Sequence, residues 1–213
     1  MRSLRHLLFA GGKIKNSDYD NKFKEIVESF INNGMDKKYA WDDYHAVAFR
    51  TMVLVDAWWK LRERNALSLD LSNKILETLK VHGDFMLDRK HYESGRNHGL
   101  NEIASLLLLS TSFPDIEGAK DWHAAATKRL EESAAILIDD DGSLVENSSY
   151  YHFYVLEKYW EIYDYMQRYY IPAGDFFKER LNKMILYSTF ILQPNLDVPL
   201  LGASIEKKNK ISG

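Results

Sequence analysis

Apolar side chains recur every three to four residues along almost the whole chain, whereas the strict alternation that marks a β-strand is nearly absent. Glycine, proline and Asp-Gly turns divide this helical pattern into long runs with short connections. Helices joined by short loops run antiparallel. The sequence therefore predicts an all-α fold of antiparallel helical hairpins, with helices over about residues 18–33, 41–64, 69–88, 97–113, 116–138, 146–169 and 175–192.

The composition limits the class of protein and its partners. The 213 residues are 46% hydrophobic, which is enough for one large domain or a small pair. A net charge of −3 argues against nucleic-acid binding, and the lack of cysteine excludes disulfides, thiol catalysis and cysteine metal sites. No apolar run approaches a membrane span, and Leu7–Ala10 is too short for a signal peptide. We expect no nucleic-acid or membrane partner, and a periplasmic or secreted location if a signal peptide was removed, otherwise a cytoplasmic one.

The chain changes character after residue 192. Pro194, Pro199 and Gly202 punctuate the next segment, and the stretch Lys207–Lys210 is strongly charged. A solvated segment of this kind is typical of a linker. We therefore divide the chain into an N-terminal lead-in (1–16), a helical domain (17–192) and an extended tail (193–213) that leads into a region absent from this chain.

A polar group opens the helix predicted to begin at residue 97. An asparagine at a helix start is most often a plain N-cap, and the histidine after it is usually just exposed. Helix N-termini also attract anions through free N–H groups and the helix dipole, so Asn97 and His98 would suit a carboxylate. His98 and Glu102 have the spacing of metal ligands, but no third ligand is evident. We expect neither a metal nor a cofactor.

A second polar group opens the helix predicted from residue 146. Tyr150, Tyr151 and His152 follow one another there. Such a group often makes an aromatic contact between helices, but it can also place a phenol at a cleft as an acid or base. Because free tyrosine has a pKa near 10, a catalytic tyrosine needs a positive charge or a donor beside it. His98, His152 or Arg96 would supply it.

A third polar group lies in the helix predicted from residue 41. Trp41 and His45 are one helical turn apart, and Arg50 follows them. These residues suit a half-buried helix end. They also suit a sugar site, in which the tryptophan stacks on the ring and the arginine pairs with an acidic group.

The carboxylates suggest a rival function. Asp42, Asp43, the aspartates at 139–141 and Glu146 could include the two acids of a toroid glycoside hydrolase. Aspartates of this kind also serve turns and helix starts, and their spacing does not place two of them on one substrate. A non-catalytic helical module that binds carbohydrate or acts as a scaffold is the third alternative.

Together these stretches resemble the N-terminal helical domain of the heparinase II/III-like polysaccharide lyases, a family that includes alginate lyases. Order and approximate spacing agree over residues 38–202. An Asn-His pair followed about fifty residues later by Glu-x-Ser-x-x-Tyr-His is the most specific part. The matching pieces are Trp41 to Arg50, Asn97-His98-Gly99 with the leucine run and Phe113-Pro114, Trp122 with Ala126, Asp141-Gly142, and Glu146 to His152.

The resemblance implies an incomplete (α/α) toroid and cleavage of uronic-acid polysaccharides by β-elimination. In such lyases the uronate carboxylate is neutralised, and a tyrosine with a histidine moves protons between C5 and the leaving glycosidic oxygen. Carried over to this sequence, Asn97 binds the carboxylate, His98 assists it or acts as base, and Tyr151 is the acid/base. The resemblance implies an acidic polysaccharide or oligosaccharide as partner, and a substrate groove lined by Trp41, His45, Arg50, Arg96, Glu146, Tyr150 (also the reserve acid/base) and His152.

The sequence departs from this family in two respects. Its members continue into a β-sandwich region that contributes further catalytic residues, often a histidine, and this chain holds none of it. In the stretch 197–204, Ala203 stands where an aspartate is usual. We therefore expect a truncated piece, a naturally short product or a relic, which binds oligouronate weakly and does not cleave it alone. An apolar face left uncovered by the missing region would favour a homodimer.

Overall fold

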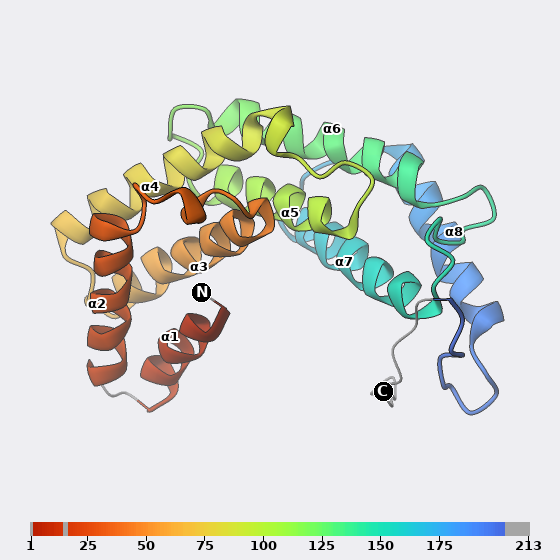
Figure 1. Ribbon diagram of the computed structural model, residues 1–213, viewed down its shortest axis with the longest axis horizontal. Coiled ribbons are helices and arrows are strands. Elements are labelled where there is room, and N and C mark those ends of the chain that lie inside the picture. Colours follow the sequence, from red (N-terminus) through yellow and green to blue (C-terminus); the bar gives the residue numbers. More distant parts are fainter. Residues whose placement is uncertain (1, 15–16, 203–213) are drawn as a thin grey trace. The chain divides into compact units, whose positions relative to one another are not determined.

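A computed structural model of the chain describes residues 2–14 and 17–202, and the elements found there are helical (Figure 1). Two short 3-10 turns, η1 (Lys38–Ala40) and η2 (Arg89–His91), precede α3 and α5. Each of the seven predicted helices is present, with ends within about three residues of the prediction. The helices are α1 (Arg2–Ile14), α2 (Ser17–Asn33), α3 (Tyr44–Glu63), α4 (Leu69–Leu87), α5 (Asn97–Ser112), α6 (Ala119–Leu137), α7 (Ser149–Arg168) and α8 (Asp175–Ile191).

Side-chain caps explain where several helices begin. Asp43 accepts a hydrogen bond from the Ala46 backbone N–H at 3.1 Å and so starts α3. Ser148 accepts one from the Tyr151 N–H at 3.3 Å and starts α7 three residues after the predicted position. In the described residues, no helix combines the length and the apolar character that crossing a membrane requires.

The chain folds into two compact units, each made from two stretches of sequence. Unit 1 comprises Met1–Glu93 and Asn101–Ala126. Its core includes fully buried side chains of α3, α4 and α6, and Trp122 packs directly on Gly83 of α4, where a Cβ would clash with the indole. The indole N–H of Trp122 donates to Asp84 at 3.2 Å. A glycine inside α4 is therefore required by this close approach.

Helix α1 is the one helix that the sequence did not predict. Arg64 attaches it to unit 1, because its guanidinium donates to Asp20 of α2 at 2.6 Å and to the Leu8 carbonyl of α1 at 2.9 Å. Gly11 lies so close to the Asp20 carboxylate that a Cβ would not fit. The Gly11-Gly12 pair, a breaker in sequence terms, thus permits close helix packing instead.

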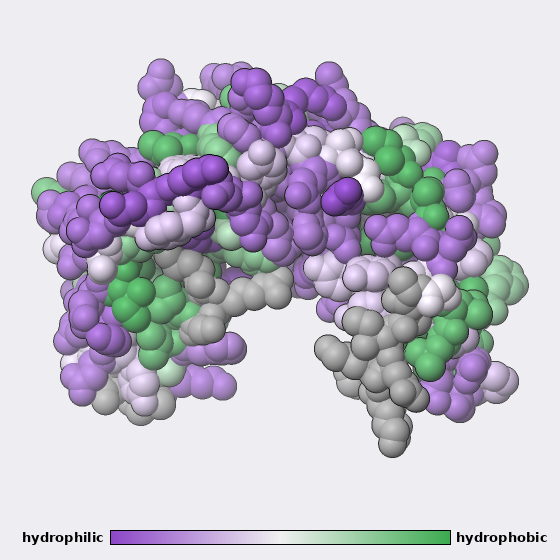
Figure 2. Space-filling model, viewed as in Figure 1, coloured by the Kyte–Doolittle hydropathy of each residue, from purple (hydrophilic) through white to green (hydrophobic). Residues whose placement is uncertain are grey.

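Unit 2 comprises Ser94–Leu100 and Thr127–Gly213. Tyr159 is fully buried, donates to Ser133 at 3.1 Å and packs against Phe177 of α8 with 5.5 Å between ring centroids. These contacts join α6, α7 and α8. Hydrophobic residues also gather on the surface over α8 and the segment after it (Figure 2), among them Leu186 and Phe190.

Candidate functional site

The start of α5 presents the first group of predicted site residues. Gly95 has a φ of 74° and turns the chain into the helix, and the Arg96 carbonyl accepts from the Gly99 N–H at 3.1 Å. Arg96 and His98 are exposed. Asn97 is half-buried, and its amide forms no hydrogen bond with another residue within 2–14 and 17–202. This amide therefore remains available to a ligand at the N-terminus of a helix.

A tight turn delivers the second group at the start of α7. The Gly142 N–H donates to the Asp139 carbonyl at 3.0 Å, and Gly142 has a φ of 89° beside the Lys183 backbone, where no Cβ would fit. Glu146 is exposed in the following turn. Asn147 adopts a φ of 49°, a left-handed conformation that asparagine tolerates better than most residues. The chain thus reverses within a few residues before α7 begins.

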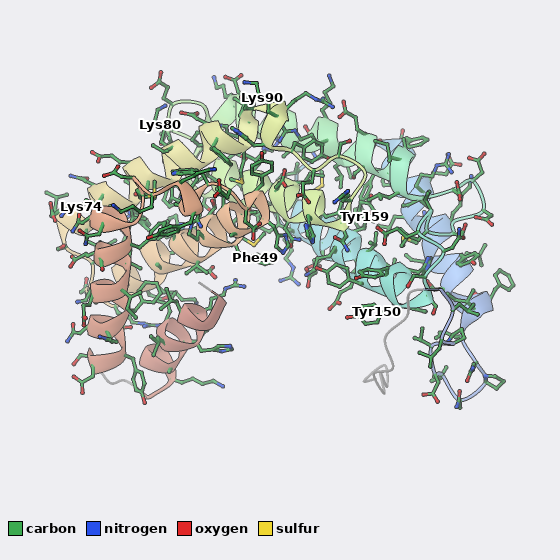
Figure 3. The ribbon with its side chains drawn as sticks, in the orientation of Figure 1. Phe49, Lys74, Lys80, Lys90, Tyr150 and Tyr159 are labelled. Atoms are coloured by element: carbon green, nitrogen blue, oxygen red, sulfur yellow. The ribbon has the colours of Figure 1, made fainter. Side chains whose placement is uncertain are left out.

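Tyr151 lies half-buried in the first turns of α7. Its ring packs edge-on against Tyr150, with 5.4 Å between centroids, and against Tyr154 at 6.5 Å. Its hydroxyl forms no hydrogen bond with another residue in the part of the chain that the structure describes. Tyr150 and the core residue Tyr159 project from opposite sides of α7 (Figure 3), as their spacing along a helix requires. The phenol of Tyr151 is therefore held by aromatic neighbours and remains free for proton transfer.

His152 has a different environment from its neighbour Tyr151. It is 2% exposed, and its Nε2 lies 2.9 Å from the Ser188 hydroxyl, which donates to the Met184 carbonyl at 2.8 Å. Because that hydroxyl donates elsewhere, Nε2 carries the proton, and Nδ1 is left without a hydrogen-bond partner. Burial lowers the pKa of His152, and the Met184 carbonyl opposes this only in part. A neutral His152 does not supply the positive charge that Tyr151 was expected to need.

A small pocket adjoins His152 on the side of α8. Its volume is about 130 Å³, and its lining comes from the turn before α7, from α8 and from Leu201. The Ser149 hydroxyl donates to the Pro199 carbonyl and accepts from the Leu201 N–H at 3.3 Å, so the tail is fastened to the start of α7. The sequence analysis missed both Ser188 and this attachment, because a lone serine in a helix and a proline-containing tail carry no pattern that points to α7.

Replacing Ser188 with alanine should lower the free energy of unfolding by about 1–2 kcal/mol, because His152 loses its hydroxyl partner in a buried position. Nitrogen NMR of the His152 ring should also show a less uniform Nε2–H tautomer. Thr189→Ala is a matched control, since that exposed hydroxyl donates only to the Leu186 carbonyl of the same helix. An unchanged tautomer and unchanged stability would show that Ser188 does not hold the ring.

The third group of predicted residues lies in unit 1. The Trp41 indole donates to the Met35 carbonyl at 2.8 Å and packs against Phe85 at 4.9 Å between centroids. His45 is half-buried, with its ring edge-on to Phe49 at 4.5 Å (Figure 3). Both side chains have structural contacts within unit 1, and their contact with a substrate remains a prediction.

Arg50 is buried next to a neutral histidine. It is 6% exposed, donates to the Ala40 carbonyl and lies 5.1 Å from the centroid of Phe30. Burial lowers its pKa, while Asp43 acts in the opposite direction. His82 of α4 is fully buried, and burial together with the charge of Arg50 lowers its pKa to about 3. Arg50 would reach an acidic sugar only if its surroundings opened.

Most of the carboxylates of the rival hydrolase reading have structural partners. Asp43 caps α3, Asp140 pairs with Arg180 at 2.6 Å, and Asp141 accepts from the Ser143 N–H at 2.8 Å. These hydrogen bonds from Ser143 lower the pKa of Asp141. The carboxylates are also divided between the two units, with Asp42 and Asp43 in unit 1 and the others in unit 2.

Seven predicted site residues therefore belong to one compact unit. Unit 2 contains both the start of α5 and the start of α7, whereas unit 1 contains the other three residues. Within unit 2, the free amide of Asn97 can bind an anion and the free phenol of Tyr151 can exchange a proton. The seven residues are Arg96, Asn97, His98, Glu146, Tyr150, Tyr151 and His152.

Comparisons with known proteins agree on one family. The family model described as heparinase II/III N-terminus matches residues 13–212. The crystal structure of a mutant heparan sulfate lyase from Pedobacter heparinus is similar with a TM-score of 0.75, at 17% identity, over 92% of this chain and 32% of that one. The crystal structure of a heparinase III is similar with a TM-score of 0.76, at 20% identity, over 90% of this chain and 30% of that one. No curated protein matches the sequence.

These similarities confirm the predicted fold class, the all-α incomplete (α/α) toroid of antiparallel helical hairpins. The resemblance drawn from the sequence motifs is also confirmed, because the family model covers nearly the whole helical region. The chain spans less than a third of the length of the two solved structures. Ala203, the position where the family pattern has an aspartate, lies outside the described residues.

Proposed function

Because the chain belongs to the heparinase II/III N-terminus family, we propose that it is the N-terminal helical domain of a polysaccharide lyase. Its substrate is a uronic-acid polysaccharide, and its reaction is β-elimination. The solved relatives are named for heparan sulfate and heparin, which supports a sulfated or carboxylated polysaccharide rather than a neutral one. Within the chain, residues 17–192 are the helical domain and residues 193–213 connect it to a further region.

One observation supports this function above the others. Unit 2 carries an uncommitted amide on Asn97 and an uncommitted phenol on Tyr151, each at the start of a helix. An enzyme that removes a proton next to a carboxylate needs a donor for that carboxylate and a separate group for the proton. The hydrolase alternative instead needs two opposed carboxylates, and the aspartates of this chain mostly serve turns, caps and ion pairs.

In the proposed reaction, Asn97 donates a hydrogen bond to the uronate carboxylate, with His98 beside it. This interaction stabilises the negative charge that develops when the C5–H bond breaks. The C5 electron pair forms the C4–C5 double bond as the C4–O bond to the leaving sugar breaks. Tyr151, with His98, transfers a proton between C5 and the leaving glycosidic oxygen. The products are an unsaturated uronate and a sugar with a new hydroxyl group, so atoms and charge balance.

The remaining predicted residues are proposed to bind the substrate. Arg96 and Glu146 are exposed at the two helix starts, and Tyr150 flanks Tyr151. His152 acts from behind α7 as a buried neutral side chain, and Trp41, His45 and Arg50 contribute from unit 1. The chain alone binds the polysaccharide but lacks groups that turnover requires, since its relatives have about three times its length.

Calorimetric titration with a panel of uronic-acid oligosaccharides tests this proposal, with ultraviolet absorbance followed in the same samples. The expected result is binding to acidic oligosaccharides without growth of absorbance from an unsaturated product. A neutral oligosaccharide of equal length serves as the control ligand. Binding of the neutral sugar alone, or of no sugar, would contradict a lyase domain. Rapid growth of absorbance would instead show that the helical domain suffices for cleavage.

A further inference from the structure

We propose that unit 1 carries an additional binding surface for the anionic groups of a polysaccharide, formed by α1 and the second half of α3. This surface uses none of the predicted site residues, and its ligand class rests on the proposed function. Its central members are Phe9 of α1 and Trp59, Lys60 and Arg62 of α3. We call them the α1–α3 basic surface.

Lys60 is held above an exposed aromatic ring. Its ammonium lies 4.7 Å from the ring centroid of Phe9, which is 47% exposed although α1 has buried apolar positions available. The Arg5 guanidinium lies 6.0 Å from the same centroid. A cation over the face of an aromatic ring is attracted by the ring quadrupole. Lys60 therefore has a preferred position instead of sampling its full range of rotamers.

Arg62 is held in the same way on a pair of tryptophans. Its guanidinium lies 4.8 Å from the ring of Trp58 and 5.9 Å from that of Trp59. Trp59 is 46% exposed and stacks on Phe113 at 6.0 Å between centroids and 20° between planes. The aromatic stack is anchored in unit 1 and fixes the arginine at its edge.

Neither of these two cations has a carboxylate partner within the described residues. This distinguishes them from Arg5, which donates to Asp56 at 2.7 Å, and from Arg64, which pairs with Asp20 at 2.6 Å. Exposed His6 and Lys13 on α1 add donors on the same helix as Phe9, whereas Glu63 is an exposed acid beside them on α3. Within the described residues, the free charge of Lys60, Arg62 and Lys13 thus exceeds that of Glu63.

Fixed, unneutralised cations are suited to bind anions. A lysine or arginine normally loses side-chain entropy when it is ordered by a ligand, and prior ordering by a ring reduces this loss. A free positive charge also attracts anions over about 8–10 Å at physiological salt. A polyanionic sugar offers sulfate or carboxylate groups at repeated intervals. A chain long enough to engage both the proposed site and the α1–α3 basic surface would gain affinity through multivalency.

The test compares long heparan sulfate chains with a heparan sulfate tetrasaccharide, using the double variant Lys60→Gln, Arg62→Gln. Affinity for the long chains should fall about fivefold to tenfold at ~0.15 M salt and vary less with salt, while tetrasaccharide affinity stays unchanged. The matched control is Lys74→Gln, Lys80→Gln, which also removes two positive charges from unit 1. These lysines are paired with Asp70 at 2.7 Å and Asp84 at 2.8 Å (Figure 3), and this variant should bind as the wild type does.

The outcomes separate this inference from the proposed function. If the double variant binds long chains as the wild type does, or if the control variant weakens equally, the α1–α3 basic surface is not a specific site. If Asn97→Ala loses the tetrasaccharide in the same experiments, the proposed function still stands. If the wild type binds neither long chains nor tetrasaccharide, both ideas are wrong. Tighter binding to anionic vesicles than to the polysaccharide would also overturn the inference.

Discussion

Lowering the pH from 7 to 4 should cost the protein about 3 kcal/mol of stability through His82 alone. The His82 ring is fully buried in unit 1, and its Nδ1 lies 3.1 Å from the Thr51 hydroxyl, which donates to the Val47 carbonyl at 2.9 Å. Burial and the nearby charge of Arg50 lower its folded-state pKa to about 3, against 6.5 for the free side chain. A protonated imidazole in this position would be a buried charge beside another charge.

The sign follows from the protons that each state binds. Between pH 6.5 and pH 3 the unfolded chain binds a proton on His82 and the folded chain does not, so stability rises with pH across this window. The stability is complete above 6.5 and is lost as the pH falls toward 3. His152 acts in the same direction, because burial lowers its pKa too.

Urea denaturation at a series of pH values measures the effect. His82→Gln removes the titrating group, so the difference in unfolding free energy between wild type and variant should change by about 3 kcal/mol from pH 7 to pH 4. Taking the difference also cancels the carboxylates common to both proteins. His6→Gln, which alters an exposed histidine of α1, is the control. Parallel pH curves for wild type and His82→Gln would contradict a neutral buried His82.

Replacing Asn97 with alanine should weaken the binding of a uronic-acid oligosaccharide at least about tenfold, the usual value of a hydrogen bond to a charged group. The amide is half-buried at the start of α5 and has no partner among the described residues, so its loss should cost little stability. Calorimetry supplies the affinity, and a melting curve confirms folding. A variant that binds as tightly as the wild type would reduce Asn97 to an ordinary first residue of a helix.

Tyr151→Phe separates binding from proton transfer. The phenylalanine ring preserves the contacts with Tyr150 and Tyr154, and only the uncommitted hydroxyl is lost. We expect affinity for the oligosaccharide to change by less than about threefold. In a complete lyase that contains this domain, the same substitution should lower the cleavage rate by about 10²-fold or more. Full cleavage by such a variant would exclude Tyr151 as the acid/base.

Local sequence signals predicted the fold well where breakers and caps agree with periodicity. Asn97 begins α5 at the predicted residue, and α4 and α8 end within one residue of their predicted ends. Helix α1 escaped prediction because Gly11 and Gly12 resemble a loop, while their actual role depends on Asp20 and Arg64 at a distance in sequence. Trp41 was expected inside a helix, but Asp43 caps α3 after it and leaves Trp41 at the end of η1.

The candidate site was predictable as a set of residues but not as a set of environments. Sequence order placed Tyr151 and His152 together, yet their side chains enter different surroundings because successive residues of a helix point about 100° apart. Tyr151 is half-buried with a free hydroxyl, and His152 is buried against Ser188. The burial of Arg50 depends on its contacts with Phe30 and the Ala40 carbonyl, which no local pattern reveals.

The way the two units share the chain determines how the protein can be divided into fragments. Their boundaries fall after Leu100 inside α5 and after Ala126 inside α6, so each unit needs two separate pieces of polypeptide. A fragment of residues 1–93 would lack Trp122, which packs on Gly83, and a fragment of residues 127–213 would lack Asn97. Neither half can therefore be exchanged between related proteins by a single crossover. Recombination would need two coordinated crossovers, so the two units are expected to be inherited together.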